Sequence, residues 1–330
     1  MMKGLNSLVF AIVTGIFAVS CVRGDKPIIR PENPRNIGGP PQYGPGWSKG
    51  VTITDGLQDI WFTNNNVGFT VGAGVRGIYR STNGGDNWSK ATSSDTTGYW
   101  NLFFLNEKYG WAVGPTIISY SSDSGKTWKD MNKNIPGVSN AEFNDIYFVN
   151  KDTGFATTSA GLIQSIDGGV NWTRTPATPS STYTLAYYDF GRGIIGTGNG
   201  IRYTADSSKT FANGGGSIGS VIVVQTLGAS DAVCIDNRGS LWKSADKGAN
   251  WTSTLTPFKD TYFDIQFADP NNGYVMSTNM VYKITNNTAE RVLYYPVSSN
   301  RGFSEFHFNK DFTRGWVIYS NGTVFRYVKP

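Results

Sequence analysis

One eight-residue phrase recurs along the chain and constrains its fold more than any other feature. It is clearest as Ser165 to Trp172 (SIDGGVNW) and returns as Ser121 to Trp128 (SSDSGKTW) and Ser244 to Trp251 (SADKGANW). Two more divergent copies are Ser81 to Trp88 (STNGGDNW) and Thr204 to Phe211 (TADSSKTF). The closing aromatic residues follow one another at intervals of 39 to 44 positions. A fixed period of this length is the signature of a repeat architecture.

Each copy of the phrase joins two predicted strands. The residues before it alternate between apolar and polar, and the phrase itself gathers Asp, Gly and Asn, which is turn chemistry. A metal-binding role would need the Asp-x-Asp-x-Asp-Gly ligand series of a calcium loop, which the phrase lacks. Because there are five pseudo-equivalent copies, we interpret their polar and aromatic positions as structural: Asn83, Asp123, Asp167, Asp206, Asp246, Trp88, Trp128, Trp172, Phe211 and Trp251.

Seven repeats share one order of elements. An apolar first strand, such as Ile60-Trp61-Phe62, is followed by a turn and a second strand that begins with glycine and an apolar residue, such as Gly68-Phe69. In the fifth repeat we place Asp231-Ala232 at that glycine-apolar position. A third strand and the phrase complete the unit. The sixth repeat has lost the phrase at residues 285–290, and the seventh ends after its third strand.

The incomplete seventh repeat predicts how the fold closes. Gly46 to Lys49 resembles a fourth strand that has no first three strands before it, and a third strand near Thr323 to Tyr327 has no fourth. We therefore predict an all-β fold over residues 45–330. It is a seven-bladed β-propeller of four-stranded antiparallel blades, closed when the N-terminal strand joins the C-terminal blade. Such closure removes exposed sheet edges.

The residues before the propeller indicate export and anchoring. Lys3 and the apolar run 8–17 are typical of a signal peptide, and Ala18 to Cys21 resembles a bacterial lipobox. That resemblance implies that residues 1–21 are a lipoprotein signal and that Cys21 is acylated, with an ordinary secretory signal as the alternative. Residues 22–44, rich in Pro and Gly, are predicted to be a linker. We expect a lipid-anchored cell-envelope protein, at the surface or on the periplasmic side of the outer membrane, with the lipid as its only membrane contact.

Charge and cysteine content argue against a nucleic-acid partner and against a disulfide. The formal net charge is +5 without a run of Lys or Arg, so a nucleic-acid partner is not predicted. If Cys21 carries lipid, Cys234 has no disulfide partner, and its apolar neighbours predict a buried, inert thiol. No cofactor or metal site is predicted.

The repeated phrase resembles the Asp-box (BNR) hairpin of β-propellers. Together with the glycine-aromatic second strands and the export signal, it makes the chain similar to photosystem II stability/assembly factor-like propellers. That resemblance implies a non-enzymatic binding or assembly scaffold. Photosynthetic members bind a membrane protein, with basic residues of one face implicated, but the arginines of this chain are scattered among the repeats and match no such cluster.

Asp-boxes also occur in enzymes, so the alternative function is a carbohydrate-active propeller (sialidase-like or another glycoside hydrolase) or a glycan-binding propeller. A glycosidase needs two facing carboxyls, and the first strands carry Asp59, Asp145, Asp264 and Glu305, with Asn101 and Thr184 at matching places. The simpler interpretation is that each acid caps its own strand or loop. His307, the only histidine, lies between Phe306 and Phe308 and is predicted to be a packed side chain. We therefore predict that the protein is not an enzyme.

A binding face is predicted from the connections between repeats. In propellers the loops from a fourth strand to the next first strand share one face with the second-to-third-strand turns, opposite the Asp-boxes. Aromatic and arginine side chains are enriched at binding hot spots. The candidates on this face, for a protein or glycan ligand outside the cytoplasm, are Tyr99, Trp100, Tyr183, Tyr262, Arg76, Arg238 and Arg301. The alternative is that the aromatic residues of this set are core residues of the inner strands.

Overall fold

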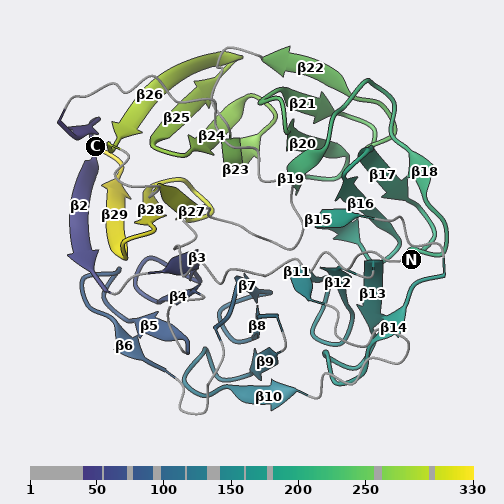
Figure 1. Ribbon diagram of the computed structural model, residues 1–330, viewed down its shortest axis with the longest axis horizontal. Coiled ribbons are helices and arrows are strands. Elements are labelled where there is room, and N and C mark those ends of the chain that lie inside the picture. Colours follow the sequence, from purple (N-terminus) through teal and green to yellow (C-terminus); the bar gives the residue numbers. More distant parts are fainter. Residues whose placement is uncertain are drawn as a thin grey trace, which may run out of the picture.

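The computed structural model describes residues 40–53, 56–72, 77–91, 98–115, 117–131, 142–159, 161–176, 181–255, 262–296 and 302–330. In this part of the chain every regular element is a strand, and no helix is long and apolar enough to cross a membrane. The strands form seven antiparallel sheets arranged as blades around a central axis (Figure 1). The predicted all-β, seven-bladed propeller is confirmed.

The blades run from the innermost to the outermost strand. Blades 1 to 4 are β3 (Leu57–Phe62), β4 (Gly68–Gly72), β5 (Tyr79–Ser81) and β6 (Ser89–Lys90); β7 (Asn101–Phe104), β8 (Gly110–Val113), β9 (Ile118–Ser121) and β10 (Lys129–Met131); β11 (Phe143–Phe148), β12 (Gly154–Thr158), β13 (Gly161–Ser165) and β14 (Thr173–Arg174); and β15 (Thr182–Asp189), β16 (Arg192–Thr197), β17 (Gly200–Thr204) and β18 (Ala212–Asn213). Blades 5 to 7 are β19 (Val221–Leu227), β20 (Asp231–Asp236), β21 (Leu241–Ser244) and β22 (Thr252–Leu255); β23 (Tyr262–Asp269), β24 (Asn272–Ser277), β25 (Met280–Thr285) and β26 (Thr288–Tyr294); and β27 (Phe303–Phe308), β28 (Arg314–Tyr319), β29 (Thr323–Val328) and β2 (Trp47–Thr52).

The ring closes where the two ends of the propeller pair. β2 runs antiparallel to β29 as the fourth strand of blade 7, with Trp47 opposite Tyr327 and Thr52 opposite Thr323. Trp47 is buried, and its ring centroid lies 5.3 Å from that of Tyr327 and 6.0 Å from that of Phe308. Closure by the N-terminal strand is thus confirmed, and the closing strand carries a core residue with it.

A short strand that the sequence did not predict precedes this closure. β1 (Gln42–Tyr43) lies in the segment interpreted as a linker, and it pairs with β26 at the outer edge of blade 6. The Arg291 guanidinium donates to Gln42 Oε1 at 2.7 Å, and the Gly44 N–H donates to the Val292 carbonyl at 2.8 Å. The chain therefore contacts blade 6 before it completes blade 7, and this contact adds a second attachment at the closure.

The five Asp-boxes form the turns between third and fourth strands with one hydrogen-bond pattern. In blade 3 the Ser165 hydroxyl donates to Asp167 Oδ1 at 2.9 Å, the Gly169 N–H donates to Ser165 Oγ at 2.8 Å, and the Asn171 N–H donates to Asp167 Oδ1 at 2.9 Å. The Trp172 indole donates to the Gly169 carbonyl at 2.9 Å. An equivalent backbone bond is accepted by Asn83, Asp123, Asp206 and Asp246. These side chains accept hydrogen bonds from backbone N–H groups of their own turns, which is the structural role that their repetition predicted.

The glycine that begins most second strands makes room for an aromatic ring. Gly68 pairs with Phe62, and a Cβ on Gly68 would lie 2.4 Å from the Phe62 ring. That ring stacks on Trp316 of blade 7 with centroids 3.5 Å apart. Further stacks between neighbouring blades join Phe69 to Phe104, Trp111 to Phe148, Phe155 to Tyr187 and Tyr274 to Phe308. The glycine-aromatic pattern therefore packs each of these blades against the next.

In the fifth repeat, the residue at the place of the second-strand glycine is one position later than the sequence analysis put it. Ala232, not Asp231, pairs with Thr226 at the place where other repeats pair a glycine with an aromatic residue. A methyl group fits there because Thr226 presents no ring. Two residues on, Cys234 is a free thiol, and burial raises its pKa, which agrees with the prediction of a buried, inert cysteine.

Candidate functional site

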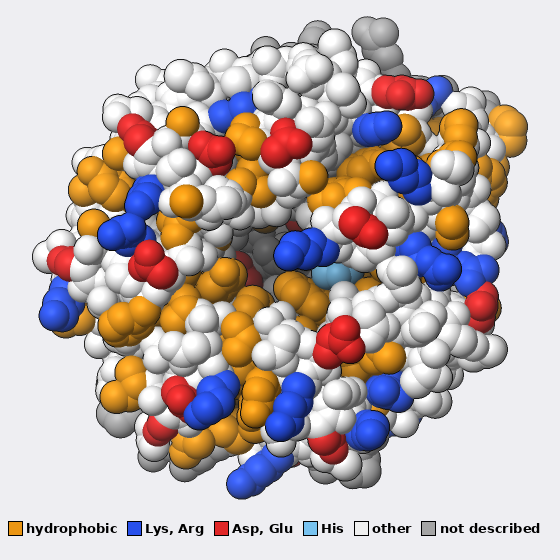
Figure 2. All heavy atoms as spheres, turned by 180° about the vertical axis from the view of Figure 1, so that it is seen from behind, with side chains coloured by type: hydrophobic (Ala, Val, Ile, Leu, Met, Phe, Trp, Pro, Cys, Tyr) orange, Lys and Arg blue, Asp and Glu red, His pale blue; other side chains and the backbone are white. Residues whose placement is uncertain are grey.

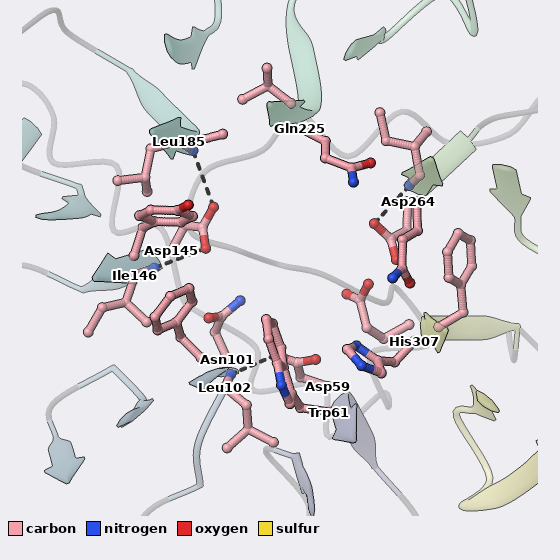
Figure 3. Close-up of a pocket in the computed structure, with 18 of the residues that line it drawn as sticks. Asp59, Trp61, Asn101, Leu102, Asp145, Ile146, Leu185, Gln225, Asp264 and His307 are labelled. Carbon is pink, nitrogen blue, oxygen red and sulfur yellow. Dashed lines mark hydrogen bonds between the residues drawn. The ribbon is translucent and has the colours of Figure 1, made fainter. Parts of the chain in front are cut away.

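Equivalent side chains of the inner strands form two layers around the channel, since these strands pair with their neighbours in matching registers. The first layer lies near the start of the inner strands, where four of them shift register with their neighbour. It is called the acidic layer and consists of Asp59, Asn101, Asp145, Asp264 and Glu305. The second lies two residues further along and is called the aromatic layer: Trp61, Phe103, Tyr147, Gln225, Gln266 and His307. Both line a central cavity of about 340 Å³ (Figure 3).

Three carboxylates of the acidic layer, those of Asp59, Asp145 and Asp264, bind backbone N–H groups. Asp59 Oδ2 accepts the Leu102 N–H of blade 2 at 2.6 Å, and Asp145 Oδ2 accepts the Leu185 N–H of blade 4 at 3.3 Å. Asp145 and Asp264 also accept the N–H of the residue that follows each of them, at 2.9 and 2.8 Å. The predicted capping of the acid's own strand is present in Asp145 and Asp264, while Asp59 and Asp145 bind a backbone N–H of the next blade.

Two glutamines of the aromatic layer were missed by the sequence analysis, and both join neighbouring blades. Gln225 Nε2 donates to the Phe267 carbonyl at 3.0 Å, while its Oε1 accepts the Phe267 N–H at 2.8 Å. Gln266 forms the same pair of bonds with Phe308, both at 2.7 Å. The signal was in the sequence, because Gln225, Gln266 and His307 are each 41 residues apart, which is one repeat.

His307 continues the same connection across the closure of the ring. Its Nε2 lies 3.0 Å from the Phe62 carbonyl oxygen, so the hydrogen bond requires a proton on Nε2. Burial lowers the pKa of His307 to about 4, despite the opposing effect of the carbonyl. The imidazole is therefore neutral at physiological pH and serves as a packed donor, as its place between two phenylalanines predicted.

Aromatic rings occupy the rest of this layer as a continuous arc. The Trp61 ring centroid lies 4.9 Å from that of His307 and 5.7 Å from that of Phe103, and Phe103 lies 5.0 Å from Tyr147. The Tyr147 hydroxyl donates to the Tyr187 carbonyl of blade 4 at 3.0 Å. One side of the cavity is thus lined by ring faces and edges, and the other by amide side chains.

The structure does not gather the predicted binding-face aromatics into one exposed patch. Tyr99 is fully buried and its hydroxyl lies 2.7 Å from Ser119 Oγ, while Tyr183 is 8% exposed. Trp100 is half-buried directly before β7. Tyr262 begins β23, and its side chain lies outside the described part of the structure. Of the described aromatic side chains in this set, Trp100 is the most accessible.

The predicted arginines divide between a structural ion pair and positions outside the described residues. Arg238 binds Asp236 Oδ2 through Nε at 3.0 Å and Nη2 at 2.8 Å, and its Nη2 also donates to the Ser217 carbonyl at 2.6 Å. Asp236 is buried, so Arg238 balances an interior charge although its own side chain is 55% exposed. Arg76 and Arg301 lie outside the described residues.

The face that carries the first-to-second-strand turns has its own hollow at the channel, about 1180 Å³ in volume (Figure 2). Asparagine-rich turns of blades 7, 1 and 2 surround it. Asn64 Nδ2 donates to Glu107 Oε2 at 3.0 Å, and Asn309 Nδ2 donates to Asn65 Oδ1 at 2.6 Å. These side-chain bonds connect neighbouring turns and shape the rim of the hollow.

Comparisons with known proteins agree with this architecture. A family model described as photosynthesis system II assembly factor YCF48 matches residues 46–141, from the closing strand through blade 2. The solved structure "YCF48 bound to D1 peptide" is 18% identical, with a TM-score of 0.68, over 88% of this chain and 99% of that one. YCF48 from Cyanidioschyzon merolae is 16% identical, with a TM-score of 0.68, over 86% of this chain and 99% of that one.

An enzyme shares the fold more distantly. An ancestral GH74 enzyme is 11% identical, with a TM-score of 0.63, over 86% of this chain but 45% of its own length. No curated protein matches the sequence. The resemblance to photosystem II assembly factor-like propellers is thus confirmed, by the family model over residues 46–141 and by the fold over the whole ring.

Proposed function

We propose that this protein is a non-enzymatic binding or assembly module that holds a segment of another protein outside the cytoplasm. The observation that carries the proposal is the match of the assembly-factor model to residues 46–141, combined with a ring that superposes on nearly the full length of a YCF48 bound to a peptide. A closed ring of seven blades is a stiff support, and ligands of such folds are bound by the loops it displays.

The chemistry of the channel favours binding over catalysis. Asp59 and Asp145 accept backbone N–H groups of the next blade, and Asp264 accepts one from its own strand. These hydrogen bonds give the three carboxylates a structural role within and between blades. The single histidine donates to a carbonyl and is neutral. We therefore infer that the protein is not a glycoside hydrolase, although it shares its fold with one.

The proposed location follows from the first residues of the chain. Residues 1–21 read as a lipoprotein signal, and acylation of Cys21 would tether the propeller to a membrane of the cell envelope. Cys21 lies outside the described residues. A propeller held near a membrane is well placed to receive an exported segment of a membrane protein, and this is the class of partner we propose.

A crosslinking experiment with the full-length, acylated protein in its native membrane tests the proposal. Partners captured in place are identified, and the crosslinked segment is then made as a synthetic peptide. We expect that peptide to bind the purified propeller in a one-to-one complex and to compete with the crosslinked protein. Specific binding or hydrolysis of glycans, with no peptide able to bind, would contradict the proposal and favour the carbohydrate-active alternative.

A further inference from the structure

The Asp-box turn of blade 3 exposes two apolar side chains. Ile166 is the most exposed large hydrophobic residue that the structure describes, at 73%, and Val170 of the same turn is 47% exposed. The other four boxes hold polar or small residues at these two positions: Thr82, Ser122, Ala205 and Ala245 at the first, and Asp86, Lys126, Lys209 and Ala249 at the second. The turn itself therefore requires neither isoleucine nor valine, and their exposure needs another explanation.

These residues lie beside a groove between blades 2 and 3 on the Asp-box face. Val170 lines the groove, which has a volume of about 420 Å³, together with the half-buried Tyr109, Tyr120 and Met131 of blade 2. The rings of Tyr109 and Tyr120 are nearly parallel, at 7°, with centroids 6.4 Å apart. We call these five residues the blade 2–3 patch. Apolar side chains of two blades meet at this place instead of being scattered singly, which is typical of an interaction surface.

The polar residues around the groove have the chemistry of a membrane interface. Lys108 and Lys151 line it, and Lys108 Nζ lies 5.1 Å from the ring centroid of Tyr109. In Figure 2, hydrophobic and basic side chains lie next to one another on the lower part of this face, where blades 2 and 3 are. Tyrosine rings and lysine stems cover apolar surface while their polar ends stay in water. Because Asp152 and Asp167 line the same groove, its charge is nearly balanced, and the contact is apolar in character.

The proposed anchor brings a lipid surface within reach of this patch. Residues 22–39, between Cys21 and the first described residue, span at most about 60 Å. β1 begins opposite Tyr294, at the end of β26 away from the Asp-box face, and the seven residues of β26 measure about 23 Å. The tether is therefore long enough for the Asp-box face to lie on the membrane that holds Cys21. Tethering also makes this contact intramolecular, so a small apolar patch is sufficient.

We propose that the blade 2–3 patch is a second membrane contact of the anchored protein. Ile166 and Val170 enter the headgroup region of the bilayer, while the tyrosine hydroxyls and the lysine ammonium groups stay at its water side. The inference rests on the acylation of Cys21 in the proposed function. It departs from the expectation that the lipid is the only membrane contact, because the exposure of this turn is a property of the folded ring. The inter-blade loops on the opposite face then point away from the membrane and remain accessible to the proposed partner.

A polarity-sensitive fluorophore on one introduced cysteine tests the contact in the full-length, acylated protein on phosphatidylcholine vesicles. Cys21 carries the lipid and Cys234 is buried, so the introduced thiol is the one that reacts. We expect Ile166→Cys to give blue-shifted emission that spin-labelled lipids quench. The controls are Ala245→Cys, at the same box position in blade 5, and Asn199→Cys, exposed in the β16–β17 turn of the opposite face. Quenching at position 166 that is no stronger than at position 245 or 199 would overturn the proposal.

Exchanging the two exposed residues locates the contact. Ile166→Ser with Val170→Lys gives this turn the residues of the blade 2 box, and Ala245→Ser with Ala249→Lys makes the same change in blade 5 as the control. The chain from residue 22, without lipid, is sedimented with an excess of phosphatidylcholine vesicles. We expect the blade 3 double variant to partition at least about tenfold less than the wild type, and the blade 5 variant to stay within about twofold. Equal effects of the two double variants would overturn the assignment, as would binding that requires phosphatidylglycerol.

Anchoring and docking fail in distinguishable ways. If the full-length protein does not float with the vesicles, the proposed lipid anchor and this inference both fail. If it floats but the fluorophore at position 166 reports water, this inference fails alone. A blue shift at position 166 that appears without vesicles, in the lipid-free chain, and grows with protein concentration identifies a second copy as the occupant and overturns the proposal. Capture of a partner peptide tests the binding role separately from all three.

Discussion

His307 Nε2 lies 3.0 Å from the carbonyl oxygen of Phe62, 245 positions away in the sequence, and this bond connects the inner strands of the last and first blades. Gln225 and Gln266 make the corresponding connections from blade 5 to blade 6 and from blade 6 to blade 7. The three side chains occupy one position of the repeat. At the closure of the ring, the position that holds a glutamine amide in blades 5 and 6 therefore holds a titratable imidazole.

Acid should weaken the fold through this histidine. The pKa of His307 is lowered to about 4 from an ordinary value of 6.5, so the unfolded chain binds the proton more readily than the folded one. The contribution to stability is complete above about pH 6.5 and is lost as the pH falls towards 4. The imidazole lines a cavity, so we reduce the full linkage value and expect a loss of about 1–2 kcal/mol in the free energy of unfolding. Urea unfolding at a series of pH values measures it.

The chain itself supplies the matched variant. His307→Gln places at this position the residue found in blades 5 and 6, where the amide binds the next inner strand in both directions. We expect the variant to keep its stability at pH 7 and to lose most of the pH dependence between 6.5 and 4.5. If the wild type and His307→Gln respond equally to acid over that range, His307 is not the titrating group.

Much of this packing could be predicted from the period, and the errors have physical causes. The glycine before each aromatic residue was visible as a pattern, but its reason, a ring seated over Gly68, needed the strand register. Tyr99 was predicted on an exposed loop, although by repeat position it matches Leu57 and Phe143, both 1% exposed. Its burial follows from the same register. Exposure at strand starts depends on where the backbone irregularity falls, and the sequence does not mark that position.

The central cavity was less predictable than the blades. The acids of the first strands were recognised, but their hydrogen bonds to the next blade depend on the spacing between strands that only the closed ring defines. The interpretation of residues 22–44 as a linker also missed β1, because two residues carry no periodic pattern. Glutamines at positions 225 and 266 were detectable only by comparing one position across repeats.

Truncations at the N-terminal side of the propeller test the closure. Deleting residues 45–55 removes β2 with Trp47, exposes the edge of β29 and opens the stacking around Phe308 and Tyr327. We expect a loss above about 3 kcal/mol in the free energy of unfolding, comparable with removing a large core aromatic. Deleting residues 22–40 should leave the melting temperature nearly unchanged, and deleting 22–43, which also removes β1, should have an intermediate effect. Equal melting temperatures for the three truncations would contradict closure by β2.

The Asp-boxes should behave as structural turns. Asp167→Ala removes the acceptor of bonds from Asn171 N–H and Nδ2 and from Ser165 Oγ, and should cost about 1–3 kcal/mol. Asn83→Asp restores the acid found in the other boxes and should be neutral or slightly stabilising at pH 7. Thermal unfolding of the Asp167→Ala and Asn83→Asp variants at pH 7 measures these two effects.

The Asp-box of blade 4 should also respond to acid. Hydrogen bonds from Thr210 lower the pKa of Asp206 to about 2, so the stabilisation that they provide is present above about pH 4 and is lost as the pH falls to 2.

Lipid attachment can be tested independently of the fold. If Cys21 is acylated, Cys21→Ala should abolish incorporation of labelled palmitate and release the protein from the membrane fraction. Cys234→Ala is the control, since that thiol is buried in blade 5 and cannot accept a lipid without unfolding. Equal labelling of Cys21→Ala and the wild type would show that residues 1–21 are an ordinary secretory signal or that another group is modified.

The final prediction concerns the face that binds the partner. Trp100 precedes the inner strand of blade 2 on the face of the inter-blade loops and is half-buried, so Trp100→Ala should reduce peptide capture several-fold with a small change in melting temperature. Ile166 is the matched control, because it is 73% exposed in an Asp-box turn on the opposite face. Tyr99→Ala should instead lower the melting temperature, since that ring is fully buried. Loss of capture in Ile166→Ala with full capture in Trp100→Ala would place the partner on the Asp-box face.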